Sequence, residues 1–260
     1  MNVLTSMVPR SGLRVLVTGG ASGIGLTISR AFVEAGARVH VCDVDASAIA
    51  ALDSVIKGTH ADVSDLAGVK RVFEDVQANL GGLDVLINNA GISGPTGAVE
   101  DIDVAHWEQT VSINLNSHFY FVQQAVPLLR AGKDGGSIVF ISSVAGRLGY
   151  AFRAPYSSTK WALVGLAKSL AIELGPDNIR VNAVQPGIVE GPRMERVIAA
   201  SAAQAGINHD EMRQRYLEKI SLRRMVTQEE VAASVLFLCS PAGSAISGQA
   251  ISVCGNVETL

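Results

Sequence analysis

Residues 14–25 read R-V-L-V-T-G-G-A-S-G-I-G, and this stretch predicts the fold. Five residues typical of a buried strand run directly into a glycine turn, and apolar residues then recur at helical spacing from Leu26 to Ala35. Glycines let the backbone turn tightly and approach a pyrophosphate, while the amino terminus of the next helix offers N–H groups to phosphates. The spacing is G-x-x-x-G-x-G, and an ordinary strand-to-helix turn is the alternative. The stretch predicts a dinucleotide-binding loop whose cofactor contacts come from Gly19, Ser22, Gly23, Ile24 and Gly25.

A second expected strand, residues 38–42, ends at Asp43, about twenty residues past the glycine loop. A carboxylate at this place can accept hydrogen bonds from the adenosine ribose, and it repels a 2′-phosphate. Val44, the next residue, supplies no positive charge to attract that phosphate. The pattern therefore predicts NAD in preference to NADP. The alternative is a turn or capping acid, and Asp45 is an equally good cap for the following helix.

Short apolar segments alternate with helical ones along the whole chain. We expect strands at residues 14–18, 38–42, 58–62, 83–88, 136–141, 179–185 and 249–253, and helices at about 23–35, 46–55, 65–79, 104–131, 155–174 and 227–239. This alternation is typical of one α/β domain, over residues 1–260, with a parallel sheet buried by helices on both faces. Residues 1–12 form an amino-terminal extension. The charged segment 190–224 is expected to be a substrate lid or, alternatively, a pair of solvated surface helices.

Tyr156 and Lys160 lie four residues apart in Y-S-S-T-K, and Ser143 precedes the tyrosine by thirteen residues. Residues four apart share a face of a helix, so the Lys160 ammonium can lie near the Tyr156 hydroxyl. A nearby cation favours the phenolate, which makes the hydroxyl a better proton donor and acceptor near neutral pH. By itself, such a pair is more often part of a solvated helix face.

Six motifs taken together resemble the short-chain dehydrogenase/reductase family in its single-domain form. They are T-G-G-A-S-G-I-G at 18–25, N-N-A-G at 88–91, Asn114, Ser143, the Tyr156–Lys160 pair and P-G at 186–187. The resemblance covers about residues 13–255. It implies a Rossmann-type, doubly wound, seven-stranded parallel sheet. It also implies an NAD(H)-dependent oxidoreductase that interconverts a small-molecule secondary alcohol and ketone by hydride transfer.

The resemblance also assigns roles to the catalytic candidates. Ser143 orients the substrate oxygen, and Tyr156 is the general acid/base. Lys160 holds the nicotinamide ribose and makes the tyrosine more acidic. Asn114 anchors a water molecule that continues the proton path from Lys160 to solvent.

Further cofactor contacts follow from the resemblance. The residues concerned are Asp62 and Val63 at the adenine, Asn89, Ala90 and Gly91 along the adenosine side, and Pro186, Gly187, Ile188 and Val189 near the nicotinamide. Two positions depart from the family pattern. Gly191 stands where many members have a threonine, and V-C-G-N at 253–256 replaces V-D-G-G, at an expected assembly surface. A homo-oligomer, a tetramer, is implied, and the helix over 155–174 supports it because it is apolar around most of its circumference.

The composition limits the possible functions. The chain of 260 residues has a net charge of −3 and no basic stripe, so nothing favours a nucleic-acid partner. Cys42, Cys239 and Cys254 are scattered, as are the five histidines, which indicates a reducing compartment and no metal site. We find no signal peptide and no apolar run of membrane-spanning length, so no membrane association and a cytoplasmic location are expected.

The substrate itself is not determined by these patterns. Arg193 begins the expected lid, and Arg147 and Arg153 flank a stretch expected beside the substrate, so an anionic substrate is one hypothesis. The alternative is that Arg193 pairs with Glu190 or Glu195 while the other two meet solvent or a cofactor phosphate. A second function class is an NAD(H)-binding regulatory scaffold without turnover. The complete Asn-Ser-Tyr-Lys set favours the enzyme, because a scaffold does not need it.

Overall fold

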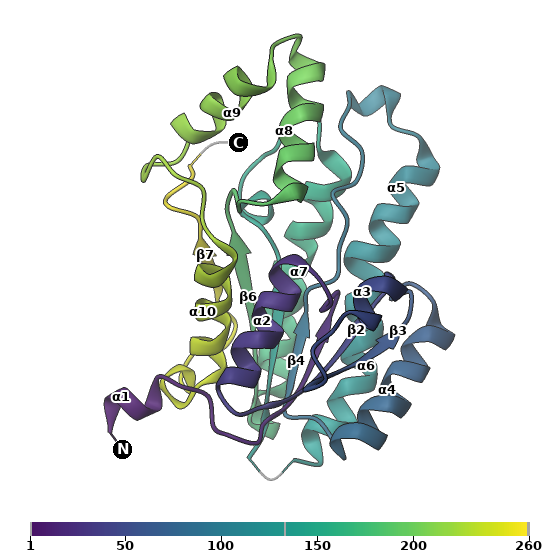
Figure 1. Cartoon of the computed structure of the whole chain (residues 1–260), viewed down its shortest axis with the longest axis vertical. Coiled ribbons are helices and arrows are strands. Elements are labelled where there is room, and N and C mark those ends of the chain that lie inside the picture. Colours follow the sequence, from purple (N-terminus) through teal and green to yellow (C-terminus); the bar gives the residue numbers. More distant parts are fainter. Residues whose placement is uncertain (1, 133, 259–260) are drawn as a thin grey trace.

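The computed structural model describes residues 2–132 and 134–258 and confirms the predicted α/β architecture. Seven strands form one sheet in the order β3-β2-β1-β4-β5-β6-β7, and all neighbours are parallel (Figure 1). Their bounds are β1 (Arg14–Thr18), β2 (Arg38–Asp43), β3 (Ile56–His60), β4 (Val85–Asn88), β5 (Gly136–Ile141), β6 (Ile179–Pro186) and β7 (Ala250–Val253). The chain order reverses beside β1, which pairs with both β2 and β4. Open sheets of this kind bind ligands at such a switch point, beyond the carboxyl ends of the strands.

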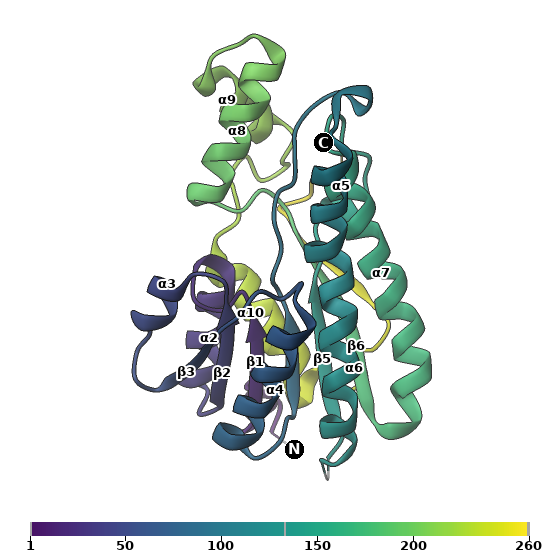
Figure 2. The same cartoon turned by 90° about the vertical axis from the view of Figure 1, so that its right-hand side faces the viewer.

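Helices cover both faces of the sheet (Figure 2). One layer contains α4 (Leu66–Leu80), α6 (Ser117–Arg130) and α7 (Ala154–Leu174), and the other contains α2 (Gly23–Glu34), α3 (Ala46–Ala50) and α10 (Gln228–Cys239). Strand β1 shows why both layers are needed: Leu16 belongs to the core under the first layer, and Val15 and Val17 belong to the core under the second. Side chains of a strand alternate between faces, so a strand apolar at successive positions requires cover on both.

The strand predicted at 58–62 lies two residues earlier, and the helix predicted at 46–55 ends five residues earlier. Strand β3 pairs with β2 from Ile56 to His60, so the residues at 61 and 62 follow the strand. Helix α3 ends at Ala50, because residues 51–55 turn back toward the strand and the Ile56 N–H bonds to the Asp53 carbonyl at 2.9 Å. Both differences are small and leave the topology unchanged.

The predicted helix over 104–131 is helical throughout but changes pitch. Helix α5 (Val104–Val111) passes through a π-helical turn, Ser112–Asn116, into α6. A π turn inserts an extra residue into the helix, and such turns are frequent at functional sites. Asn114 lies inside this turn and is fully buried.

The charged segment 190–224 contains two helices, α8 (Pro192–Ala205) and α9 (His209–Glu218), that project beyond the carboxyl end of the sheet (Figures 1 and 2). They rest on a third apolar cluster, made of Val144, Ile188, Ile198, Tyr216, Ile220, Met225, Cys254 and Val257. The segment therefore has a buried side and is not a fully solvated pair of helices. Its movement as a lid stays a prediction.

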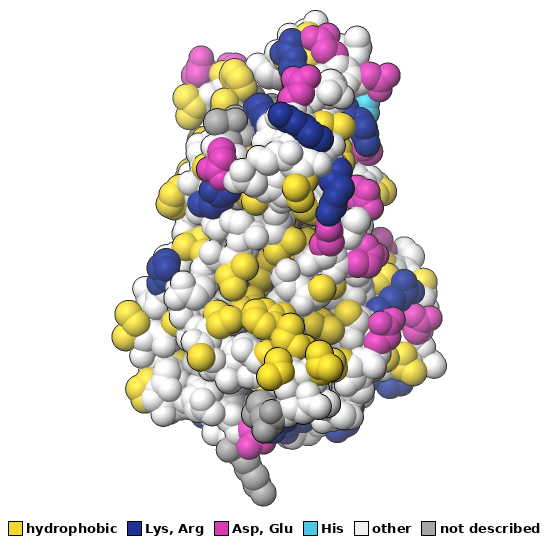
Figure 3. Space-filling model, turned by 90° about the vertical axis from the view of Figure 1, so that its left-hand side faces the viewer, with side chains coloured by type: hydrophobic (Ala, Val, Ile, Leu, Met, Phe, Trp, Pro, Cys, Tyr) yellow, Lys and Arg dark blue, Asp and Glu magenta, His cyan; other side chains and the backbone are white. Residues whose placement is uncertain are grey.

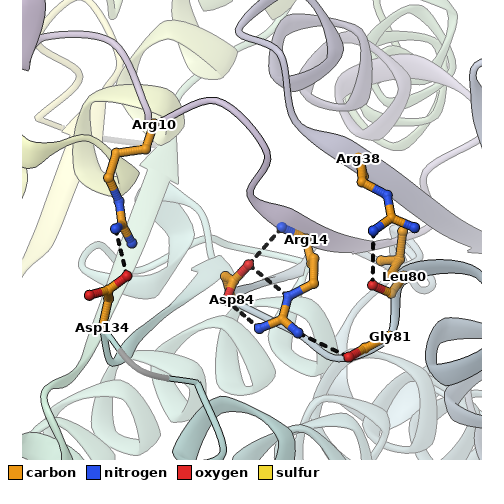
Figure 4. A network of polar contacts seen from close by, with 7 residues as sticks. All are labelled: Arg10, Arg14, Arg38, Leu80, Gly81, Asp84 and Asp134. Carbon is orange, nitrogen blue, oxygen red and sulfur yellow. Dashed lines mark hydrogen bonds and ion pairs between the residues drawn. The ribbon is translucent and has the colours of Figure 1, made fainter.

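At the opposite end of the sheet, polar contacts join the first strand to its neighbours (Figure 4). The Arg14 guanidinium donates to both carboxylate oxygens of Asp84, at 2.7 and 2.9 Å, and its backbone N–H donates to the same group at 2.8 Å. Arg10, in the extension that also contains α1 (Val3–Ser6), pairs with Asp134 at 2.7 Å. These contacts fix the amino end of β1, far along the strand from its glycine loop.

Candidate active site

A cavity of about 790 Å³ opens at the carboxyl ends of the central strands, beside α8. Every residue predicted to contact the cofactor lines it: Gly19, Ser22, Gly23, Ile24, Gly25, Asp43, Asp62, Val63, Asn89, Ala90, Gly91, Tyr156, Lys160, Pro186, Gly187, Ile188 and Val189. Ser143 lines it as well. Asn114 does not, because it is buried behind the wall. The fold thus brings the predicted residues together on one surface.

The glycine loop is shaped by contacts that exclude side chains. Gly19 has a φ of 59°, which glycine adopts easily, and a Cβ at Gly25 would lie 2.0 Å from the Gly19 carbonyl oxygen. Ser22 is the residue before α2, but its side chain makes no capping hydrogen bond, in contrast to Asp65 before α4. The first N–H groups of α2 therefore face the cavity without a side-chain partner, as anion binding at a helix amino terminus requires.

Asn89 holds the loop after β1 against the loop after β4. Its side-chain amide donates to the carbonyls of Thr18 and Gly19 at 2.9 and 3.0 Å. The Thr18 hydroxyl in turn accepts from the backbone N–H groups of Asn89 and Ala90, both at 3.0 Å. The Asn89 side chain thus shapes the cavity wall through contacts inside the protein.

Asp43 lies at the end of β2, 9% exposed, with its carboxylate beside the glycine loop. It accepts from the backbone N–H of Ala21 at 3.1 Å and from that of Asp45 at 3.2 Å. Asp45 caps α3 through the N–H groups of Ser47 and Ala48. The capping role therefore belongs to Asp45, and Asp43 both lines the cavity and fixes the loop.

Tyr156 and Lys160 lie one turn apart on α7. The Lys160 Nζ is 5.7 Å from the centre of the Tyr156 ring and donates to the Ile141 carbonyl at 2.8 Å. Lys160 is only 3% exposed. Its burial and the positive charge of Arg193 lower the pKa of Lys160 to about 7, because a buried ammonium loses hydration and a like charge repels it.

The two serines that follow β5 have different surroundings. Ser142 donates to the Lys160 carbonyl at 2.8 Å and so anchors α7 to the strand. Ser143 accepts from the Ala145 N–H at 3.1 Å. With Ser142 occupied by the backbone of α7, Ser143 is the better placed of the two to meet a ligand.

Asn114 lies behind the wall and holds the loop after β4. Its side chain accepts from the Ile92 N–H at 2.8 Å and donates to the Ile92 carbonyl at 3.0 Å. A Cβ at Gly91 would lie 3.2 Å from the Asn114 Oδ1 and 3.6 Å from the Lys160 Nζ. Asn114 and Lys160 therefore flank the same glycine, while the water-anchoring role of Asn114 stays a prediction.

The segment after β6 is held by a short parallel bridge. The Val226 N–H donates to the Ile188 carbonyl at 2.9 Å, and the Glu190 N–H donates to the Val226 carbonyl at 3.0 Å. Gly191, with a φ of 134°, then begins α8. The Ile188 carbonyl is thus already engaged, which leaves the backbone of Val189 as the freer candidate for an amide contact.

The three arginines considered from the sequence separate in space. Arg147 does not line the cavity and donates to the Val257 carbonyl at 2.6 Å. Arg193 lines it and donates to Ser93 and to the Gly91 carbonyl, both at 3.2 Å, so the predicted alternative pairing with Glu190 or Glu195 is wrong. The pairing fails because α8 directs the arginine across the cavity.

Of the other lining residues, Arg153 and the stretch before it were expected beside the substrate, whereas Gln228 was missed by the sequence analysis. Arg153 is buried in the wall, where it donates to the Ser93 carbonyl at 2.8 Å. Gln228, at the start of α10, lies against Thr27 of α2 with their side-chain oxygens 3.1 Å apart. Tyr150 contacts Tyr216 of α9 through their hydroxyls at 2.8 Å. No local signal marks Gln228, because it reaches the cavity only when α10 packs against α2.

Within residues 2–132 and 134–258, no group of three or more His, Cys, Asp and Glu side chains is arranged to hold a metal ion. The helices that the structure describes include none long and apolar enough to cross a bilayer.

Known proteins resemble this chain over nearly its full length. The model of a family described as Enoyl-(Acyl carrier protein) reductase (adh_short_C2) matches residues 19–256. "Probable galactose dehydrogenase GalD" of Rhizobium meliloti (strain 1021) is 36% identical over 251 residues, which cover 94% of each chain. Among solved structures, an actinorhodin polyketide ketoreductase with NADPH has a TM-score of 0.91 at 32% identity, covering 96% of this chain and 98% of the other. A 7α-hydroxysteroid dehydrogenase complexed with NADH and 7-oxo glycochenodeoxycholic acid has a TM-score of 0.87 at 29% identity, covering 99% and 98%. The chain belongs to the short-chain dehydrogenase/reductase family, a family of oxidoreductases.

Proposed function

We propose that this protein is an NAD(H)-dependent oxidoreductase that interconverts a secondary alcohol and a ketone. The observation that carries the proposal is the meeting of Ser143, Tyr156 and Lys160 on the wall of the cavity that the glycine loop faces. The first follows the carboxyl end of β5, and the other two come from α7. This set offers a hydrogen-bond donor, an acid/base and a cation to one ligand.

The residues present suit a nicotinamide dinucleotide. The free N–H groups at the start of α2 suit its pyrophosphate, and Asp43 suits the adenosine ribose. Asp62 and Val63 line the same end, while Pro186 and Val189 line the other. When bound, the cofactor supplies or accepts the hydride.

Residues of the protein supply and remove the proton on the substrate oxygen. The Ser143 hydroxyl donates a hydrogen bond to the substrate oxygen and holds it beside the Tyr156 hydroxyl. In reduction, Tyr156 gives its proton to this oxygen as hydride reaches the carbon, and in oxidation it takes the proton back. The Lys160 ammonium stabilises the phenolate that reduction leaves behind. Asn114 holds the loop at Ile92, next to Gly91, which lies between Asn114 and Lys160; a water molecule there can return a proton to Tyr156 through the lysine.

Tyr156→Phe tests the proposal most directly. NADH oxidation should be followed with a panel of ketones, including sugars, keto acids and steroids, in the native protein and in this variant. We expect turnover to fall at least 10³-fold, the upper part of the range for losing a general acid. NADH affinity, measured by fluorescence, should change less than about threefold, because the phenol carries the proton and holds little of the nucleotide. A variant that retains most of its turnover would refute the mechanism. NADH binding without turnover of any panel member by the native protein would favour the regulatory scaffold.

A further inference from the structure

Arg153 is buried in the cavity wall with part of its hydrogen-bonding capacity unused. It lies directly before α7, after Phe152, whose φ of 62° turns the chain. Arg153 is 3% exposed and lines the cavity. Its Nη2 donates to the Ser93 carbonyl, but its buried Nε has no partner. Buried polar groups are nearly always hydrogen-bonded, so an open donor beside a cavity indicates a missing acceptor.

Two tyrosine rings contact the same guanidinium. The Arg153 Cζ is 5.3 Å from the ring centre of Tyr150 and 5.3 Å from that of Tyr156. Aromatic rings stabilise the positive charge, but they do not replace an oxygen acceptor for the Nε–H. The contact also places this charge beside the proposed acid/base.

A second arginine approaches the same place from α8. Arg193 donates to the Ser93 hydroxyl and to the Gly91 carbonyl, and it lies close enough to lower the pKa of Lys160. Ser93 is therefore contacted by both arginines. Three cations converge here on the cavity.

Within the described chain, no carboxylate forms an ion pair with either arginine. Glu190 lines the cavity, but neither arginine pairs with it, and Glu195 pairs with His209 at 3.0 Å. A buried guanidinium without an anionic partner is unfavourable, and a carboxylate satisfies its donors in a paired, charge-assisted geometry. The missing acceptor is therefore best supplied by the ligand.

We infer that the substrate carries a carboxylate, which Arg153 and Arg193 bind while the reacting carbonyl lies at Tyr156. This inference rests on the proposed function, since it names the substrate class of the same site. A cofactor phosphate is the other source of negative charge. If Arg153 binds such a phosphate, its loss should weaken NADH binding more than acid binding.

Binding to the NADH-saturated protein tests the inference without requiring turnover. Calorimetry should compare acetate, butyrate, cyclohexanecarboxylate and benzoate with their amides. We expect at least one acid to bind tenfold more tightly than its amide. Its Kd should rise roughly 10- to 100-fold in Arg153→Met and in Arg193→Met, the range for losing a hydrogen bond to a charged group. Arg153→Lys keeps the positive charge but not the paired N–H donors of the guanidinium. We expect it to lose less affinity for the acid than Arg153→Met.

Arg213→Met is the matched control, because Arg213 is exposed on α9 and does not line the cavity. Its loss should leave the Kd of the acid within about twofold. Equal binding of every acid and its amide, or equal losses in all three Met variants, would overturn the inference. A loss of NADH affinity in Arg153→Met that exceeds the loss of acid affinity would also overturn it, because the arginine would then serve a phosphate. Should Arg153→Met fail to fold, the Kd of the acid in Arg193→Met still tests the inference, because Arg193 is exposed.

Measurements of turnover test the carboxylate site and the oxidoreductase activity independently. Native protein should reduce 4-oxocyclohexanecarboxylate with a kcat/KM at least tenfold above that of its methyl ester. Reduction of both at equal rates would refute the carboxylate site and leave the oxidoreductase intact. Tight acid binding without turnover of these two compounds or of any ketone in the panel above would contradict the oxidoreductase and leave the site intact.

Discussion

The buried ammonium of Lys160 lowers the stability of the folded protein. Its ammonium is buried, forms no ion pair with a carboxylate within residues 2–132 and 134–258, and donates a hydrogen bond to the Ile141 carbonyl. Burial and Arg193 lower its pKa from 10.5 to about 7. The native protein therefore gives up the lysine proton near pH 7, whereas the unfolded chain keeps it until about pH 10.5.

The sign of the resulting pH dependence follows from proton counting. Between pH 7 and 10.5 the unfolded state binds more protons at this residue, so its contribution to stability rises with pH. The penalty for burying the charge is complete below pH 7 and falls by about 1.4 kcal/mol per pH unit above it. Lys160→Met should therefore raise the free energy of unfolding more at pH 6 than at pH 9, by roughly 2–3 kcal/mol. Urea denaturation at both pH values checks this, and an equal gain at both would contradict the assigned burial.

The carboxylate of Asp43 has two roles that a substitution must separate, one toward the glycine loop and one toward the cofactor. Its carboxylate holds the Ala21 N–H, so removal of the side chain would also loosen the glycine loop. Asp43→Asn keeps an acceptor for that N–H and removes the charge. We expect NADH to bind more tightly than NADPH in the native protein, with the preference reduced at least tenfold in the variant, because the repulsion of the 2′-phosphate is gone. Fluorescence titration with both cofactors measures it, and a native preference for NADPH would contradict the assignment to NAD.

At the scale of elements, β1 is fixed at both ends by different chemistry. Its carboxyl end enters the glycine loop, and its amino end is held by Arg14 and Asp84 (Figure 4). That ion pair is only about a quarter exposed and is bidentate, while the Arg10–Asp134 pair nearby is mostly exposed. The two pairs offer a matched comparison of the same interaction at different burial.

Asp84→Ala should lower the free energy of unfolding by about 2–4 kcal/mol, because it leaves the half-buried Arg14 guanidinium and N–H without their acceptor. Asp134→Ala should change it by less than about 1 kcal/mol, as solvent screens an exposed pair. Urea denaturation of both variants gives the two values, and NADH titration should show unchanged affinity because both sites lie away from the cavity. Equal effects on stability would show that the strand end does not depend on the buried pair.

At the scale of the whole molecule, apolar side chains remain on the surface of the single chain. Trp161 and Ile172, on the outer side of α7, are 50% and 82% exposed. A second cluster of apolar side chains covers the face that carries α10 and β7 (Figure 3). Surfaces of this kind are typical of contacts between protein chains.

We expect a homotetramer, with the outer side of α7 in one interface. Light scattering should give about 109 kDa, four copies of the 27.2 kDa chain. Ile172→Asp should shift the mass toward smaller species, because it places a charge in an apolar contact. Val55→Asp, at an apolar position on a loop that is also mostly exposed, serves as the control and should leave the mass unchanged. A native mass near 27 kDa at micromolar concentration would rule the tetramer out.

The alternation of strands and helices, the glycine loop and the candidate residues on the cavity could be predicted from the amino-acid sequence. These depend on local properties: periodicity sets strands and helices, and parallel strands deliver the residues at their carboxyl ends to one edge. Tyr156 and Lys160 could be placed together because residues four apart share a face of α7, and Ser143 could be placed at the same edge because it follows the carboxyl end of β5.

The burial of polar groups and their contacts could not be predicted, because both depend on how distant segments pack. The buried guanidinium of Arg153, the course of Arg193 toward Ser93 and the anchoring of α7 by Ser142 join segments that are distant in the sequence. Arginines are frequent on surfaces, so nothing local distinguishes Arg153 from Arg147. Burial and partnership depend on how α7 and α8 pack against the sheet, and that packing places one arginine in the cavity and the other outside it.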